Sequence, residues 1–258
     1  MIKDFFLLAS RGSIAGVKTV NKFGRAPDGV QTTSTDIWAR ADAVPTQQIW
    51  TAPTQARQHN IVSTSTSDDG SPVGVGARTV EVYGLQDWNT AETSEIITMN
   101  GTTNVLTTNS YVIIHRMKLR TWGATSVNVG VITATAVTDG TVTAQIEASR
   151  GQTQLAIYGI PSTQDFYIGR MYANLLKTGG SGSSVDVRLF VNDNVTNQLT
   201  NFRVEHTFGI TKDGGANTQV NFYVPKKITG PAIIKMNGLG SVADLDVSAG
   251  FDGVLVTK

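Results

Sequence analysis

A regular alternation of apolar and polar residues, interrupted by short turn-forming stretches, runs from about residue 61 to the end of the chain. Side chains on a β-strand point alternately to the two faces of a sheet, so this pattern predicts strands with one covered face. In Val185–Val191, for example, the apolar residues alternate with Asp186 and Arg188. Asp139-Gly140, between two such runs, is typical of a tight hairpin turn. The pattern predicts an all-β fold.

The ranges that carry this alternation are 79–84, 95–99, 111–122, 127–137, 141–146, 154–160, 166–177, 185–191, 202–210, 219–224, 232–237 and 247–256. Range 166–177 also has apolar residues at helical spacing, but its aromatic start and Gly169 favour a strand. The spacing of the strands after Gly151 favours an antiparallel β-sandwich, similar to a jelly roll.

Residues 1–60 lack a sustained period and contain scattered glycines, prolines and aromatic residues. A structureless stretch of this length is uncommon inside a compact domain. We therefore expect an extended N-terminal arm whose Phe23, Trp38 and Trp50 dock on a neighbouring subunit, with a long surface loop as the alternative. Residues 61–150 are expected to form a first β-domain and residues 151–258 a C-terminal β-sandwich. The sequence leaves open whether these are one sandwich or two.

Composition narrows the possible functions. The chain has 258 residues, 40% hydrophobic and 16% charged, with a net charge of +1 and no cysteine. The lack of cysteine excludes disulfides and thiolate chemistry, and the near-neutral charge gives no broad electrostatic surface for nucleic acid. No apolar run approaches the roughly 18 residues of a membrane helix, and we expect no classical secretion signal at the start. Sparse charge is common where surfaces are buried against partner subunits.

No catalytic, cofactor or metal motif is recognisable. His59, His115 and His206 are widely separated and match no metal signature, and no phosphate loop or nucleophile elbow is present. His115 and His206 fall on the apolar faces of predicted strands, which indicates hydrogen-bonded core histidines. We therefore expect a protein that is not an enzyme and that needs no cofactor.

One basic stripe stands out. Arg116, Lys118 and Arg120 fall on one face of the strand predicted at 111–122. The stripe is interpreted as a solvated face or as a surface that meets an acidic neighbouring subunit; nucleic-acid binding is only weakly supported. The four tryptophans, Trp38, Trp50, Trp88 and Trp122, could form a sugar-binding platform, although core or interface anchoring is the more common role.

Several stretches, spread over most of the chain from about residue 20 onward, resemble a group of virion structural proteins of tailed bacteriophages. They are VNKFG at 20–24, DIW at 36–38, TQARQHNIVSTS at 54–65, GARTVEVYGL at 76–85, NGTTNV at 100–105, YVIIHRMK at 111–118, VGVITATA at 129–136, DGTVTAQI at 139–146, QTQLAIYGIP at 152–161 and GFDGVLV at 250–256. The stretches are not mechanistic motifs, and the family supplies no catalytic residues.

The resemblance implies a component of the virion exterior or tail. The leading hypothesis is a head decoration (cement) protein, expected to be a homotrimer, that binds the major capsid protein and stabilises the shell by bridging its subunits. Alternatives are a tail, baseplate or fibre-attachment component, and a carbohydrate-binding module that contacts host glycans. No membrane partner is expected.

Overall fold

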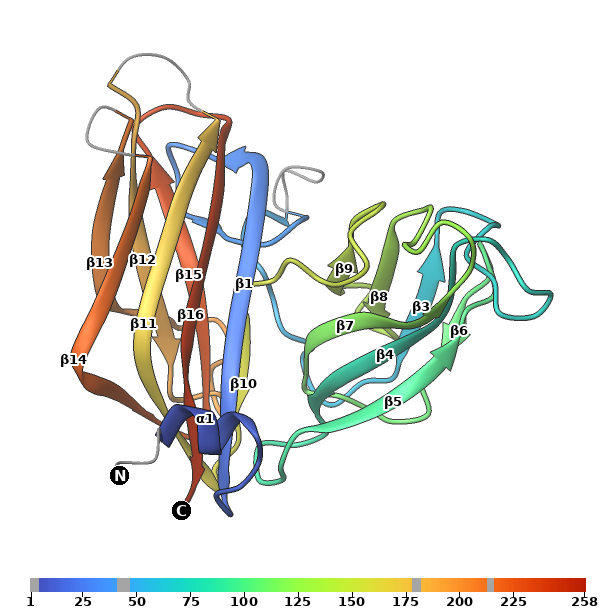
Figure 1. Ribbon diagram of the computed structural model, residues 1–258, viewed down its shortest axis with the longest axis horizontal. Coiled ribbons are helices and arrows are strands. Elements are labelled where there is room, and N and C mark those ends of the chain that lie inside the picture. Colours follow the sequence, from blue (N-terminus) through green and yellow to red (C-terminus); the bar gives the residue numbers. More distant parts are fainter. Residues whose placement is uncertain (1–4, 41–46, 178–181, 213–215) are drawn as a thin grey trace.

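The computed structural model describes residues 5–40, 47–177, 182–212 and 216–258. Almost all of its regular structure is β, arranged in two lobes that lie side by side (Figure 1). A short helix, α1 (Phe5–Ser10), precedes the first strand. No helix in the described part of the chain is long and apolar enough to cross a membrane.

The larger lobe, here called the jelly-roll lobe, contains both ends of the described chain. Its strands are β1 (Val17–Val30), β2 (Thr35–Asp36), β10 (Ile157–Ile160), β11 (Gln164–Lys177), β12 (Ser184–Asn192), β13 (Arg203–Thr211), β14 (Asn217–Thr229), β15 (Ala232–Gly240) and β16 (Leu245–Thr257). They form one sheet in the order β1-β16-β11-β14 and a second in the order β10-β15-β12-β13, with β2 paired to β15.

The pairing in this lobe is nested. β1 pairs with β16, β10 with β15, β11 with β14 and β12 with β13, each time antiparallel. Two further pairings, β11 with β16 and β12 with β15, join these ribbons into the two sheets. A long two-stranded ribbon rolled up in this way is the topology of a jelly roll.

The smaller lobe, here called the inserted lobe, lies in the chain between β2 and β10. Its strands are β3 (His59–Ser63), β4 (Ala77–Leu85), β5 (Thr93–Thr98), β6 (Val105–Leu106), β7 (Ile113–Trp122), β8 (Ile132–Ala136) and β9 (Val142–Ile146). They form two antiparallel sheets, β6-β3-β8-β9 and β5-β4-β7. The predicted all-β sandwich fold is confirmed, and range 166–177 is a strand.

The predicted N-terminal arm is wrong. β1 pairs with β16 from Val17 to Val30, so this segment is an integral strand of the jelly-roll lobe. Its inward positions include Lys22, Gly24 and Ala26, which is why no apolar alternation is visible in the sequence. Gly24 is required by close approach, because a Cβ there would lie 2.3 Å from the Ile37 carbonyl oxygen.

The tryptophans predicted to dock on a neighbour are core residues instead. Trp38 and Trp50 are fully buried within the chain. The Trp38 indole N–H donates to the Gln47 carbonyl oxygen at 3.0 Å, and the Trp50 indole N–H donates to the Thr143 carbonyl oxygen in β9 at 2.8 Å. Trp50 thereby ties the segment after β2 to the inserted lobe. Phe23 is half-buried on β1, opposite Gly250 of β16.

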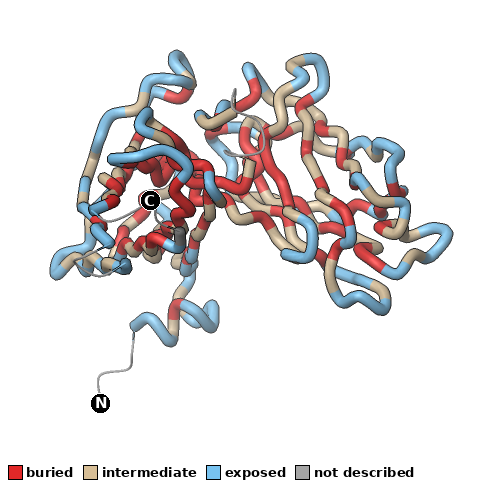
Figure 2. Tube along the Cα trace, turned by 90° about the horizontal axis from the view of Figure 1, so that it is seen from above, coloured by how far each residue is buried: buried red, intermediate tan, exposed pale blue. Residues whose placement is uncertain are grey.

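The two lobes share a hydrophobic core (Figure 2). Gly159 in β10 lets the inserted lobe approach closely, because a Cβ at this position would lie 2.7 Å from a side-chain methyl of Ile113 in β7. The inserted lobe thus covers the side of the jelly-roll lobe where β1 and β10 end their sheets.

A buried ion pair fixes the chain after β1 against the jelly-roll sheet. The Lys235 ammonium lies 2.6 Å from an Asp36 carboxylate oxygen, and both side chains are almost fully buried. Asp36 also accepts hydrogen bonds from the Asn237 side chain at 2.9 Å and from the Trp50 backbone N–H at 2.8 Å. The carboxylate therefore satisfies three buried donors from two segments.

Replacing Asp36 with alanine should lower the free energy of unfolding by about 3–5 kcal/mol, because it leaves the Lys235 charge buried without a partner. Urea unfolding followed by tryptophan fluorescence measures this loss. Asp193→Ala, which removes an exposed carboxylate paired with Arg203, is the control and should cost no more than about 1 kcal/mol. Equal losses in the two variants would contradict a structural role for the buried pair.

Candidate functional site

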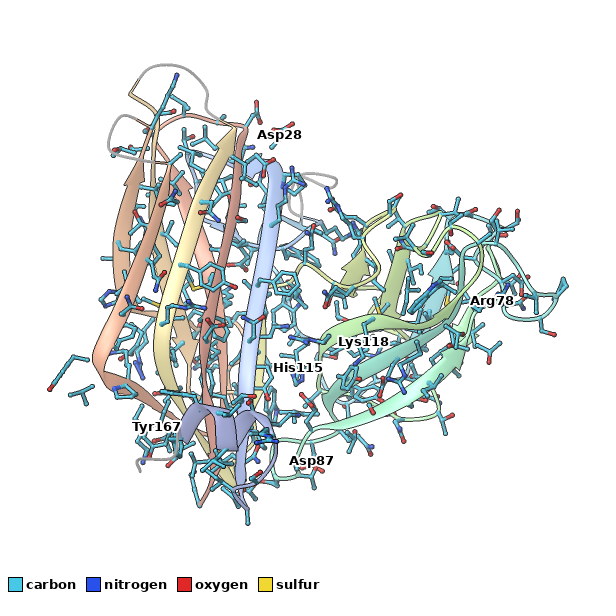
Figure 3. All side chains as sticks on the ribbon, in the orientation of Figure 1. Asp28, Arg78, Asp87, His115, Lys118 and Tyr167 are labelled. Atoms are coloured by element: carbon cyan, nitrogen blue, oxygen red, sulfur yellow. The ribbon has the colours of Figure 1, made fainter. Side chains whose placement is uncertain are left out.

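A polar pocket of about 290 Å³ lies where the two lobes meet. Its walls come from β1 on the jelly-roll side, from β7, β4 and the loop after β4 on the inserted side, and from Tyr158 of β10. Figure 3 shows His115 and Lys118 on the part of β7 that faces β1. We call this site the junction pocket.

A hydrogen-bonded group of side chains crosses the junction. The His115 imidazole Nε2 lies 2.5 Å from a Glu92 carboxylate oxygen, and the other Glu92 oxygen pairs with Lys18 of β1. The Lys22 ammonium, also from β1, donates to the carbonyl oxygen of His115. The imidazole of His115 stacks on the Tyr158 ring, with centroids 4.4 Å apart. These contacts hold the inserted lobe against the first strand of the chain.

Burial controls the charges in this group. Burial lowers the pKa of His115 below its ordinary value, although Glu92 opposes the shift, so the imidazole is neutral near pH 7. Because a carboxylate only accepts hydrogen bonds, Nε2 carries the proton and the buried Nδ1 has no hydrogen-bond partner. Burial disfavours the Glu92 carboxylate, but interactions with His115 and Lys18 outweigh it and hold the Glu92 pKa below its usual range. Burial, reinforced by the Arg116 charge, lowers the pKa of Lys22 well below that of an ordinary lysine.

The three residues of the predicted basic stripe do not share one environment. Arg116 and Lys118 line the junction pocket, and the Arg116 guanidinium donates to the Asn21 carbonyl oxygen of β1 at 2.5 Å. Arg120 lies outside the pocket, with its Nε 3.2 Å from a Glu81 carboxylate oxygen. Arg116 therefore contacts the chain's own jelly-roll lobe, in place of the predicted solvated face or neighbouring subunit.

A second surface lies on the opposite side of the jelly-roll lobe, where β13 and β14 each end a sheet. Figure 1 shows these strands far from the inserted lobe. In β13 only Ile210 is buried, and in β14 only Ile228. The inward-facing Phe208, Val220 and Phe222 remain half-buried against the core, with no further strand over them in the described part of the lobe. We call β13 and β14 together the open edge.

A bulge increases the apolar surface of the open edge. Opposite Gly169 of β11, the segment 222–225 of β14 leaves the ladder between the pairs Ile168–Lys226 and Arg170–Asn221. It presents Tyr223 and Val224 to solvent, and Val204 of β13 is also exposed. Directly after the bulge, an ion pair between Lys226 and Glu205 at 2.8 Å links β14 to β13.

The histidines and tryptophans do not form a shared site. His115 is a hydrogen-bonded core residue, as predicted, whereas His206 is only half-buried and packs on Phe222 with ring centroids 5.2 Å apart. His59 is fully buried on β3. Of the tryptophans, Trp122 alone is substantially exposed, so they form no multi-tryptophan platform. Across the described ranges, no group of three or more His, Asp or Glu side chains is placed to hold a metal ion.

Comparisons with known proteins find only weak structural similarity. No protein-family model and no curated protein matches the chain. Among solved structures, the chain is similar to the VP2 subviral particle of infectious bursal disease virus, with 12% identity over 94% of this chain and 70% of that chain and a TM-score of 0.22. It is also similar to the structure of the infectious bursal disease virus Gt strain, with 10% identity over 100% of this chain and 74% of that chain and a TM-score of 0.19. These TM-scores are too low to carry an argument, and the jelly-roll description rests on the strand pairing.

Acid should weaken the fold through its buried histidines. Burial lowers the pKa of His59 from 6.5 to about 4, so between these values the unfolded chain binds a proton that the folded chain does not. The contribution of neutral His59 to the free energy of unfolding is fully present above pH 6.5 and is lost as the pH falls toward 4. The pKa of His115 is also lowered, so His115 adds to the loss of stability in acid.

The His59 imidazole Nδ1 lies 3.0 Å from the Arg57 carbonyl oxygen, and asparagine can keep a donor near this position. In His59→Asn, the drop in unfolding free energy between pH 7 and pH 4.5 should be about 2 kcal/mol smaller than in the parent protein. Urea titrations at the two pH values measure both drops. An identical drop would show that His59 is not held neutral by the fold.

Proposed function

We propose that this chain is a structural subunit of a virus particle and that it assembles through the open edge of its jelly-roll lobe. One observation carries the proposal. β13 and β14 are long strands at the ends of their sheets, and half-buried apolar side chains lie between them. Exposed edge strands with an apolar surface are prone to pair with other chains, and monomeric proteins usually cover or charge them.

The two sides of the jelly-roll lobe differ in whether their edge strands are covered. The β1 and β10 side is covered by the inserted lobe, which supplies Ile113 against Gly159. On the β13 and β14 side, Tyr223 and Val224 are exposed at the bulge, and the Lys226–Glu205 pair lies beside them. A second copy of the chain, or another subunit of the particle, would bury these residues and the half-buried phenylalanines behind them.

Two further considerations support a virion role. Jelly rolls are common in viral capsid domains, although lectins and other proteins use the fold as well. The stretches quoted above resemble virion structural proteins of tailed bacteriophages. Within that class we propose a head decoration subunit, acting as a homotrimer that bridges copies of the major capsid protein. An oligomer that touches several capsid subunits gains avidity from modest individual contacts.

A lysine at the open edge should weaken self-association. The parent chain is expected to sediment as a trimer at micromolar concentration, and Val224→Lys should weaken association by at least about tenfold, because association would bury an unpaired charge. Analytical ultracentrifugation over a concentration series measures the effect.

Val73→Lys is the matched control, since Val73 is exposed to a similar extent in the inserted lobe (64% against 75% for Val224). Its association should equal that of the parent. A parent chain that stays monomeric throughout, or two variants that associate as the parent does, would contradict assembly through this edge.

A further inference from the structure

The junction pocket has an excess of positive charge. Four cationic side chains line it, namely Lys18, Lys22, Arg116 and Lys118, against the single carboxylate of Glu92. Glu92 is already engaged by Lys18 and by the His115 imidazole. Lys118 lies 3.9 Å from the Glu81 carboxylate, a loose contact, and its ammonium also lies 5.0 Å from the centre of the Tyr83 ring.

Two of these cations, Lys22 and Arg116, form no direct ion pair with a described carboxylate. In the part of the chain that the structure describes, no carboxylate oxygen lies within 4.0 Å of the Lys22 ammonium or the Arg116 guanidinium. Each has a backbone carbonyl as its hydrogen-bond acceptor instead, His115 for Lys22 and Asn21 for Arg116. Lys22 is only 2% exposed.

A buried ammonium with one carbonyl acceptor keeps unused donors and carries an unfavourable desolvation energy. The neighbouring Arg116 charge adds repulsion, and these two effects outweigh the opposing Glu92 charge and lower the Lys22 pKa. An anion placed between the two side chains would remove the repulsion and accept the unused N–H groups. A bound anion would thus offset the unfavourable desolvation energy of Lys22.

We propose that the junction pocket binds a single oxyanion group, held by Lys22 of the jelly-roll lobe together with Arg116 and Lys118 of the inserted lobe. The guanidinium matches the geometry of carboxylate, sulfate and phosphate oxygens, and the two ammonium groups add charge-assisted hydrogen bonds. The volume of about 290 Å³ is at the lower end of ligand pockets and suits a small anion or one acidic sugar residue. The exposed Lys18 and Asn21 at the rim give access from solvent.

The proposed ligand would bridge the lobes, because its contacts come from β1 on one side and β7 on the other. Its binding should stabilise the folded chain. This site is separate from the open edge, which lies on the other side of the jelly-roll lobe. The binding test below therefore stands or fails independently of the assembly proposal.

Isothermal titration calorimetry of the full-length chain with sodium sulfate and with sodium glucuronate, at ionic strength fixed with sodium chloride, tests the proposal. Saturable binding of at least one probe is expected. Sulfate binding alone would indicate a free oxyanion, and tighter glucuronate binding would indicate an acidic sugar.

Lys22→Met and Arg116→Gln should each weaken binding by at least about tenfold, since each removes charge-assisted hydrogen bonds. Arg150→Gln, which removes an exposed cation outside the pocket, is the control and should bind as the parent does. Lys22→Met should also melt no lower than the parent in chloride, because it removes a buried unpaired charge at similar volume, and this checks that the variant is folded. Heats that do not saturate, or equal binding in all variants, would overturn the site.

Discussion

The antiparallel pairing of β1 with β16 is the interaction on which the rest of the structure depends. It joins the first strand of the chain to the last and completes the nested order of the jelly roll. It also places Lys22 opposite Phe251, so that a lysine occupies an inward-facing position at the end of a sheet. From that position its ammonium reaches β7 of the inserted lobe. Closing the jelly roll and joining the lobes are thus consequences of one strand pairing.

The insertion makes the jelly-roll lobe asymmetric. The inserted lobe leaves the chain after β2, returns at β10, and covers the side formed by β1 and β10. The opposite side, formed by β13 and β14, keeps its half-buried apolar residues at the surface. The buried Lys22 and the half-buried Arg116 lie on the covered side, and exposed apolar residues lie on the other. We therefore propose different partners for the two sides, a small anion and another protein subunit.

The sequence predicted the strands well wherever apolar and polar residues alternate, as in β12, whose inward valines and leucine are all buried. It failed for β1, because Gly24, Ala26 and Lys22 occupy inward positions and small or charged residues give no apolar period. The burial of His115 and the common face of Arg116 and Lys118 could be read from β7 alone. The junction pocket could not, because its members come from residues 18 to 158 and meet only through long-range strand pairing.

The proposed role as a subunit of the virion exterior is tested most directly by electron microscopy of purified virus particles from the source of the gene. The particles are labelled with an antibody raised against this chain. A decoration subunit predicts label spread over the whole head surface. Label confined to one vertex would contradict decoration and indicate a tail component, and intact particles without any label would contradict the virion role itself.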